Sequence, residues 1–252
     1  MIKKNKRPSL ENIIESEDLF LDILHPGGFE ITRELAQLCH IGKVINVLDV
    51  GSGTGESAFY LVRNFNCHII GIDISDRMIK KAKRKAIDHG VIIQFKKADA
   101  HDLPFKDNTF DVVISECTTS ILDKKRAIEE MARVTRSGGY IGIHDICWKK
   151  DTPEHPKQKL AEIEFRKPET LDGWKTQFEK VGLIDIMIKD RSSLIPEWEI
   201  NISEKLGLLG RLKILLKIIK NWGIGGLRKV MESRRIFHSH YTGYGIIVGK
   251  KT

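Results

Sequence analysis

The stretch Val47-Leu48-Asp49-Val50-Gly51-Ser52-Gly53-Thr54-Gly55 decides the fold of this chain. It begins as an apolar, β-branched run, which is typical of a parallel strand covered on both faces. Three glycines at alternate positions then let the backbone turn sharply and approach a ligand without an intervening side chain. A helical pattern over residues 56–64 places free N–H groups against that turn. Strand, glycine turn and helix N-terminus together predict a cradle for a nucleotide-like ligand.

Strands and helices alternate along the rest of the chain. Apolar runs predict six further strands, at residues 67–72, 92–96, 110–115, 140–146, 184–189 and 244–248. Helical spacing predicts helices at 9–24, 32–39, 75–88, 124–135 and 171–181, with Ser137-Gly138-Gly139 closing the fourth of them. Such alternation is typical of a mostly parallel sheet with right-handed crossovers, so we predict an α/β fold.

The composition is that of a globular protein. Of 252 residues, 41% are hydrophobic and 30% are charged, which excludes a disordered chain. No apolar segment reaches the roughly 18 residues of a membrane span, and the basic start lacks the apolar core of a secretory signal. The four cysteines form no C-x-x-C pair, so we expect neither a zinc module nor a disulfide framework, and we expect a cytoplasmic location. The net charge of +8 fits a solvated surface or a basic binding face.

Acidic residues follow three predicted strands or lie within them. Asp49 lies inside the first strand, where a carboxylate can brace the turn or contact a ligand. Asp73, followed by Ile74, ends the second strand, where a carboxylate can accept from both hydroxyls of a ribose. Asp99 with Ala100 follows the third strand and can meet an adenine edge. Each acid can also be an ordinary turn residue. The third glycine of the turn comes one residue too early for the G-x-G-x-x-G pattern of dehydrogenases.

These residues carry a family resemblance. VLDVGSGTG, GIDIS and KKADAHDLPFKDNTFDVVIS, within residues 44–146, resemble class I S-adenosylmethionine-dependent methyltransferases. The resemblance implies a Rossmann-like, seven-stranded, mostly parallel sheet of order 3-2-1-4-5-7-6, with the last strand antiparallel and helices on both faces. It also implies S-adenosylmethionine as cofactor and S-adenosylhomocysteine as product. The implied cofactor contacts are the glycine turn (Gly51, Ser52, Gly53 and Gly55) at the methionine part, Asp73 at the ribose, Asp99 and Ala100 at the adenine, and Ser115 beside the sulfonium. Asp49 and Ile74 are further expected cofactor contacts.

A single methyltransferase domain over residues 1–252 is expected from this pattern. Residues 9–40 would form an N-terminal helical cover, 44–194 and 236–252 the core sheet, and 195–235 a helical insertion between the sixth and seventh strands. Within the insertion, residues 204–222 carry a broad apolar arc and a narrow lysine stripe. This segment is either a lid on the sheet edge or a peripheral contact with a membrane or an apolar substrate. Resemblance to the ubiquinone and menaquinone C-methyltransferases suits the second interpretation.

The methyl acceptor is expected at the ends of the fourth and fifth strands. Candidates for a catalytic role are His25 in the His-Pro-Gly-Gly turn, Glu116 and His144, each of which can equally be a hydrogen-bonded structural residue. The segment around Cys117 is similar to a metalloid-binding segment of arsenite methyltransferases, although the N-terminal cysteine pair of that family is absent. A small buried residue is the alternative for Cys117. We expect no metal ion.

The function predicted from the sequence is methylation of a small-molecule acceptor by in-line displacement. Positioning carries most of such a reaction, so a strong cofactor signature can occur without a catalytic triad. A non-catalytic or regulatory S-adenosylmethionine-binding module is the alternative. Nucleic acid is a less favoured partner, because Ser115-Glu116-Cys117-Thr118 stands where a base-handling Asn-Pro-Pro-Tyr motif would lie. An oxygen, nitrogen, sulfur or quinone-like carbon acceptor stays open, as does arsenite, and the sequence does not predict the oligomeric state.

Overall fold

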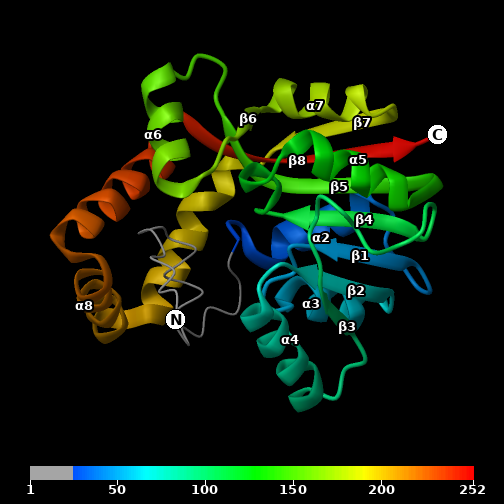
Figure 1. The fold of residues 1–252 in the computed structure, drawn as a ribbon, viewed down its shortest axis with the longest axis horizontal. Helices are drawn as coiled ribbons and strands as arrows, with labels where there is room; N and C mark the ends of the chain where they lie inside the picture. The colour runs from blue at the N-terminus through cyan, green and yellow to red at the C-terminus, as the bar shows by residue number, and fades with distance from the viewer. Residues whose placement is uncertain (1–24) are drawn as a thin grey trace.

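A twisted sheet forms the centre of the molecule and carries helices on both faces (Figure 1). The computed structural model describes residues 25–252, and for 195–203, 205 and 206 it describes the backbone alone. The predicted helix at 9–24 lies outside the described residues. The strands are β1 (Asn46–Val50), β2 (His68–Asp73), β3 (Gln94–Lys97), β4 (Phe110–Glu116), β5 (Thr135–Trp148), β6 (Glu169–Thr170), β7 (Leu183–Asp190) and β8 (Thr242–Lys251).

The strand order is β3-β2-β1-β4-β5-β8-β7, and β8 is antiparallel to both of its neighbours. Because β7 and β8 are the predicted sixth and seventh strands, the predicted order is confirmed. The two-residue strand β6, which pairs with β5, was not predicted, since a run this short leaves no periodic signal. The prediction that Ser137-Gly138-Gly139 close the helix at 124–135 is wrong. These residues belong to β5, where Gly138 has a φ of 76° and the pairing with β4 shifts register.

The helices cover the sheet in two layers. Side chains of α2 (Gly28–Leu38), α3 (Glu56–Phe65) and α4 (Asp76–Asp88) form the core on one face with Val47 and Ile114. Those of α5 (Lys124–Val134) and α7 (Leu171–Lys180) form it on the other face with Leu48 and Val113. Alternate residues of β1 and β4 therefore point to opposite cores, which explains their continuous apolar sequence.

Helix α2 approaches the sheet closely at one glycine of β5. A Cβ atom on Gly142 would lie 2.5 Å from the Sγ atom of Cys39 and 2.7 Å from a methyl group of Leu35. The absent side chain lets α2 pack directly on the strand. This contact places the turn that precedes α2, and with it His25, at the carboxyl ends of β4 and β5.

Two further helices lie beside each other at one end of the sheet (Figure 1). They are α6 (Glu154–Glu164), which was not predicted, and α8 (Ile195–Phe237), which joins β7 to β8. Helix α8 bends at Gly207 and Gly223, where φ is 57° and 66°. Much of the predicted apolar arc is exposed: Leu208 and Leu209 are 82% and 74% exposed, whereas Ile218 is buried. Within the described residues, no helix combines the length and apolarity needed to cross a membrane.

Candidate active site

The glycine turn after β1 has one open side. The N–H groups of Gly51 and Ser52 both donate to the carbonyl of Ile72, at 2.9 and 2.8 Å, which ties the turn to β2. A Cβ atom on Gly51 would collide with Thr118 and one on Gly55 with Phe95, whereas one on Gly53 would meet nothing within 4 Å. Gly51 and Gly55 are therefore required by packing. Gly53 presents bare backbone to open space, which is where a ligand can approach.

Asp73 lies at the carboxyl end of β2 and holds the same turn. One carboxylate oxygen accepts from the N–H of Gly53 at 3.0 Å, and the other accepts from the N–H of Ser75 at 2.8 Å. A carboxylate oxygen can accept more than one hydrogen bond, so this arrangement fixes the side chain and leaves acceptor capacity for ligand hydroxyls. Ile74 is 67% exposed directly beside it. The predicted ribose contact therefore adjoins an apolar surface that a flat ring can cover.

Asp99 is oriented by the histidine two residues later. Its Oδ1 atom accepts from the N–H of His101 at 2.9 Å and from the Nδ1 atom of that ring at 2.7 Å. The Nε2 atom of His101 accepts from the N–H of Asp123, so Nδ1 carries the proton. The backbone hydrogen bond and then the imidazole keep the pKa of Asp99 below its usual value. Asp99 is therefore an anionic acceptor, and Ala100 beside it is buried.

Two polar atoms near the glycine turn have no partner among the described residues. The Oδ2 atom of Asp49 and the Oγ atom of Ser52 are both buried without a hydrogen bond. Burial raises the pKa of Asp49 well above its usual value, and the charges of Glu116 and Asp73 raise it further. Such groups destabilise the ligand-free protein. A ligand that carries hydrogen-bond donors or positive charge would relieve this cost.

Replacing Asp49 by asparagine should stabilise the ligand-free protein at neutral pH. Its pKa is raised on folding, so the folded state gains stability below the ordinary value near 3.8 and loses it as the pH rises through the folded value. We expect Asp49→Asn to increase the free energy of unfolding by about 1–3 kcal/mol at pH 7.5, and by much less near pH 4. Denaturant unfolding at several pH values measures this.

Asp145 provides a matched comparison for that prediction. It is also fully buried, but its carboxylate accepts from the N–H groups of Ser120 and Ile146, both at 2.8 Å, and lies 3.9 Å from Arg166. An amide would lose one of these hydrogen bonds, so Asp145→Asn should destabilise the protein. A loss of stability in both variants would contradict the assignment of Asp49 as an unsatisfied buried group.

His25, Thr32 and Glu116 form a hydrogen-bonded group at the end of β4. The hydroxyl of Thr32 donates to both carboxylate oxygens of Glu116, at 3.1 and 3.3 Å. The hydroxyl oxygen of Thr32 lies 3.2 Å from the Nε2 atom of His25, and Nε2 of His25 lies 3.6 Å from Oε1 of Glu116. The Nδ1 atom of His25 faces the carbonyl of Pro26 at 3.3 Å, and a carbonyl can only accept. Nδ1 therefore carries a proton, and Nε2 faces oxygen atoms.

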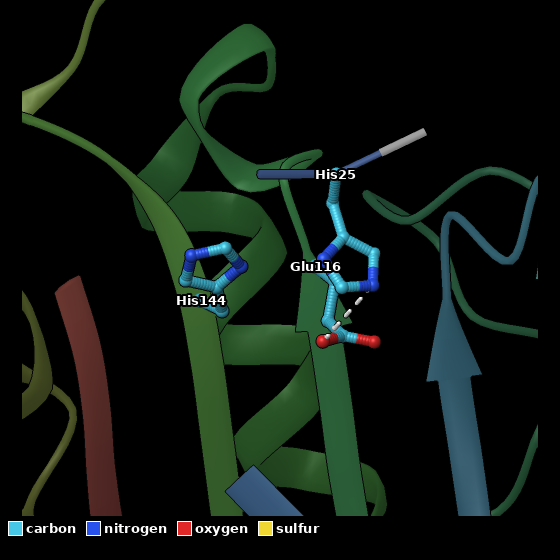
Figure 2. A group of neighbouring side chains, drawn as sticks. All are labelled: His25, Glu116 and His144. Atoms are coloured by element: carbon cyan, nitrogen blue, oxygen red, sulfur yellow. Dashed lines mark ion pairs between the residues drawn. The ribbon is translucent and has the colours of Figure 1, made fainter. Parts of the chain in front are cut away.

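His144 on β5 completes the cluster. One nitrogen or oxygen from each of His25, Glu116 and His144 lies within 4.8 Å of the other two, and Figure 2 shows the three side chains converging from separate elements. The His144 ring is fully buried, and its Nε2 atom has no partner among the described residues. Burial, followed by the charge of His25, lowers the pKa of His144 well below its usual value. This imidazole is therefore neutral at physiological pH.

The remaining predicted residues have mainly structural surroundings. Ser115 is buried and accepts a hydrogen bond from the hydroxyl of Thr119 at 3.0 Å. Cys117 adopts a φ of 54°, and its Sγ atom lies 3.9 Å from Nδ1 of His144. Cys39 and Cys147 are the cysteines that could have joined Cys117 in binding arsenite. Burial raises the pKa of Cys147 to about 12 and that of Cys39 further still, so neither offers the thiolate that arsenite requires.

Thr32 and Ser57 are functional candidates that the sequence did not reveal. Both hydroxyls lie near Nε2 of His25, Ser57 at 3.4 Å. Thr32 lies on α2 whereas His25 lies in the turn before that helix, so helical spacing gave no signal that the two side chains meet. The contact with Glu116 could not be predicted, because it depends on how α2 packs on β5.

Comparison with known proteins identifies related sequences and folds. Residues 41–192, more than half of the chain, match the family model described as "Methyltransferase domain". A phosphoethanolamine N-methyltransferase from Triticum aestivum is 31% identical over 170 residues, covering 66% of this chain and 33% of that protein. The chain therefore spans about a third of the length of that curated relative.

Solved structures share the fold at lower identity. Haemonchus contortus phosphoethanolamine N-methyltransferase 2, in complex with S-adenosyl-L-methionine, has a TM-score of 0.78 and 19% identity, covering 96% of this chain and 57% of that chain. The [4+2]-cyclase SpnF also has a TM-score of 0.78, with 20% identity and coverage of 97% and 93%. At these identities the likeness shows the fold alone.

Proposed function

We propose, from the premise that the chain belongs to the methyltransferase domain family, that it transfers a methyl group from S-adenosylmethionine to a small-molecule acceptor. The cofactor supplies a methyl group on a positively charged sulfur atom. Residues of the chain would bind that cofactor at the glycine turn and hold the acceptor at the ends of β4 and β5. The proposal thus assigns the cofactor and the acceptor to specific places in the chain.

The open side of the glycine turn is the observation that carries the proposal. The bare backbone of Gly53 lies beside the fixed carboxylate of Asp73, and the charge of Asp73 acts in turn on the buried Asp49. One carboxylate oxygen of Asp49 has no hydrogen bond among the described residues. S-adenosylmethionine has matching groups: ribose hydroxyls for Asp73 and positive charge that would offset the buried Asp49. Asp99 and Ala100 would hold the adenine, and Ser115 would lie near the reacting sulfur. The residues present thus fit this cofactor.

The cluster of His25, Glu116 and His144 would receive the acceptor. An amine or a hydroxyl loses a proton when it is methylated, so a neighbouring base raises the rate of transfer. A carboxylate and an imidazole that both contact the hydroxyl of Thr32 suit that role, and Thr32 would position Glu116. Phosphoethanolamine methyltransferases among the relatives favour an amine as the first acceptor to test. A hydroxyl is the second.

Binding of S-adenosylmethionine tests the proposal, measured by isothermal titration calorimetry. Gly53→Ala should fold, because its Cβ meets no atom, but should weaken binding at least tenfold by filling the ligand side of the turn. Gly90→Ala is the matched control, since Gly90 also has a positive φ, of 61°, and open space around it. It should bind like the wild type. Absence of binding to the wild type would refute the proposal.

Turnover distinguishes an enzyme from a binding module. Release of S-adenosylhomocysteine would be measured with small amines, phenols, quinones and arsenite. Release of S-adenosylhomocysteine with one class of compound would identify that class as the methyl acceptor. Tight binding without release from any acceptor would instead favour a non-catalytic S-adenosylmethionine-binding module, because one fold can carry unrelated functions.

Helix α8 supports peripheral contact with an anionic membrane. Leu208, Leu209 and Leu216 are exposed by 82%, 74% and 57%, and Lys213 and Lys220 are exposed beside them. Exposed apolar and basic side chains together match the interface of an anionic bilayer. Such contact would place the site near lipid-like acceptors.

Vesicle flotation tests this contact. The protein should float with phosphatidylcholine–phosphatidylglycerol vesicles at low salt and be released by about 0.5 M salt, because screening weakens the attraction. Leu208→Asp/Leu216→Asp should reduce the bound fraction several-fold. Ile92→Asp, a change at another exposed apolar residue away from α8, should not. Equal flotation of both variants would argue against α8 as the contact.

A further inference from the structure

We propose that His25, Glu116 and His144 bind one divalent transition-metal ion. The role of the ion in activating an acceptor rests on the proposed methyltransferase function, but the binding site itself does not. The sequence predicts no metal ion, because ligands at positions 25, 116 and 144 have no local spacing pattern. The fold brings them together.

The donor set is the first argument. Two imidazole nitrogens and one carboxylate oxygen are the ligands that proteins use for ions such as Zn²⁺ and Fe²⁺. The three ligand atoms lie within 4.8 Å of one another, and His25 Nε2 and Glu116 Oε1 are 3.6 Å apart. Tetrahedral bonds of about 2.0–2.2 Å hold ligand atoms about 3.3–3.6 Å apart. The pair of His25 and Glu116 already has this spacing, and the other two pairs would have to close by at most about 1.5 Å when an ion binds.

The outer contacts of the ligands are the second argument. Metal-binding histidines usually donate their second N–H to a carbonyl or carboxylate, and ligating carboxylates are themselves hydrogen-bonded. Nδ1 of His25 faces the carbonyl of Pro26 at 3.3 Å, which leaves Nε2 toward the cluster. The Thr32 hydroxyl donates to both oxygens of Glu116. These partners hold two of the three ligands in place.

The third argument is the unfilled bonding capacity of the buried groups. Nε2 of His25 has oxygen atoms of Thr32, Ser57 and Glu116 around it, at 3.2, 3.4 and 3.6 Å. His144 is fully buried, its Nε2 has no partner among the described residues, and its Nδ1 lies 3.9 Å from Cys117 Sγ. A metal ion gives all three side chains a partner.

Three protein ligands leave coordination positions open for an acceptor. A hydroxyl bound there would lose its proton more readily, because a divalent ion lowers the pKa of a coordinated oxygen. The metal site therefore narrows the proposed acceptor class toward molecules that bind through oxygen.

Cobalt uptake tests the site without any assay of turnover. Metal-free full-length protein would be titrated with Co²⁺ and followed by its visible absorption, with Zn²⁺ as competitor and bound metal counted by mass spectrometry. We expect one ion per chain. His144→Gln and Glu116→Gln should each weaken uptake at least tenfold, and His155→Gln, at an exposed histidine, should not change it.

Three results would overturn the proposal. They are no stoichiometric uptake by the folded wild type, equal uptake by His144→Gln and Glu116→Gln, or a thiolate absorption band that Cys117→Ser removes together with the bound ion. Circular dichroism establishes that each variant is folded. Binding of S-adenosylmethionine by a protein that takes up no metal would refute the metal site and leave the proposed function standing.

Discussion

Glu116→Gln is expected to lower the turnover number about 100- to 1,000-fold with the identified acceptor, while the Kd for S-adenosylmethionine changes less than threefold. The carboxylate faces His25 at 3.6 Å and accepts twice from Thr32. An amide keeps the shape of the side chain but removes the negative charge, which would take or direct the proton in a metal-free site and would hold the ion in the proposed metal site. General-base contributions of about 100- to 10,000-fold are typical. Steady-state kinetics and calorimetry measure the two quantities.

Glu164 is the matched control for this substitution. It is also a buried glutamate and accepts from the hydroxyl of Ser233 at 2.6 Å, but it belongs to the contact between α6 and α8. Glu164→Gln can keep that hydrogen bond and should leave the turnover number within about twofold. If Glu116→Gln lowered the unfolding free energy but left the turnover number and its pH profile unchanged, Glu116 would have a structural role only.

Asp73→Ala is expected to weaken S-adenosylmethionine binding at least 100-fold. Charge-assisted hydrogen bonds contribute about 1.5–3 kcal/mol each, and the variant loses acceptors for both ribose hydroxyls. It also frees the N–H groups of Gly53 and Ser75, which loosens the cradle. Asp73→Asn keeps one acceptor oxygen and should show a smaller loss. Calorimetric titration of both variants measures the difference.

Asp76 controls for changes of charge near the same turn. Its carboxylate is exposed and pairs with Lys97 at 2.6 Å on the surface of the protein. Asp76→Asn removes the same charge three residues away and should leave the Kd within about twofold. Equal weakening by Asp76→Asn and Asp73→Asn would indicate a general electrostatic effect instead of a ribose contact.

The proposed cofactor site was largely predictable from the sequence, because its signals are local. The turn from Gly51 to Gly55 and the acid Asp73 each follow a buried strand at fixed spacing, and parallel strands bring their carboxyl ends to one edge. The predicted methyltransferase family and strand order are confirmed. The predicted contacts of individual residues with the cofactor remain to be measured.

The proposed acceptor site, the cluster of His25, Glu116 and His144, was less predictable, because it depends on packing between segments that are distant in the sequence. His25 and His144 were candidates, yet nothing local indicates that they meet, and Thr32 gave no signal of its contact with Glu116. The close approach of α2 to Gly142 produces these contacts. Helix α6 was missed because its apolar face is short and interrupted by charged residues.

Helix α8 can also be viewed as the loop of a β-hairpin. The strands that it joins, β7 and β8, are adjacent and antiparallel, and Asp190 pairs with Gly245 near the point where the chain leaves the sheet. The length of α8 is therefore independent of the right-handed crossovers that connect the parallel strands of the sheet. The entropic cost of closing such a loop also grows only slowly with the length of the loop. This hairpin is a place where related proteins can gain, shorten or exchange an entire cover without altering the cofactor cradle.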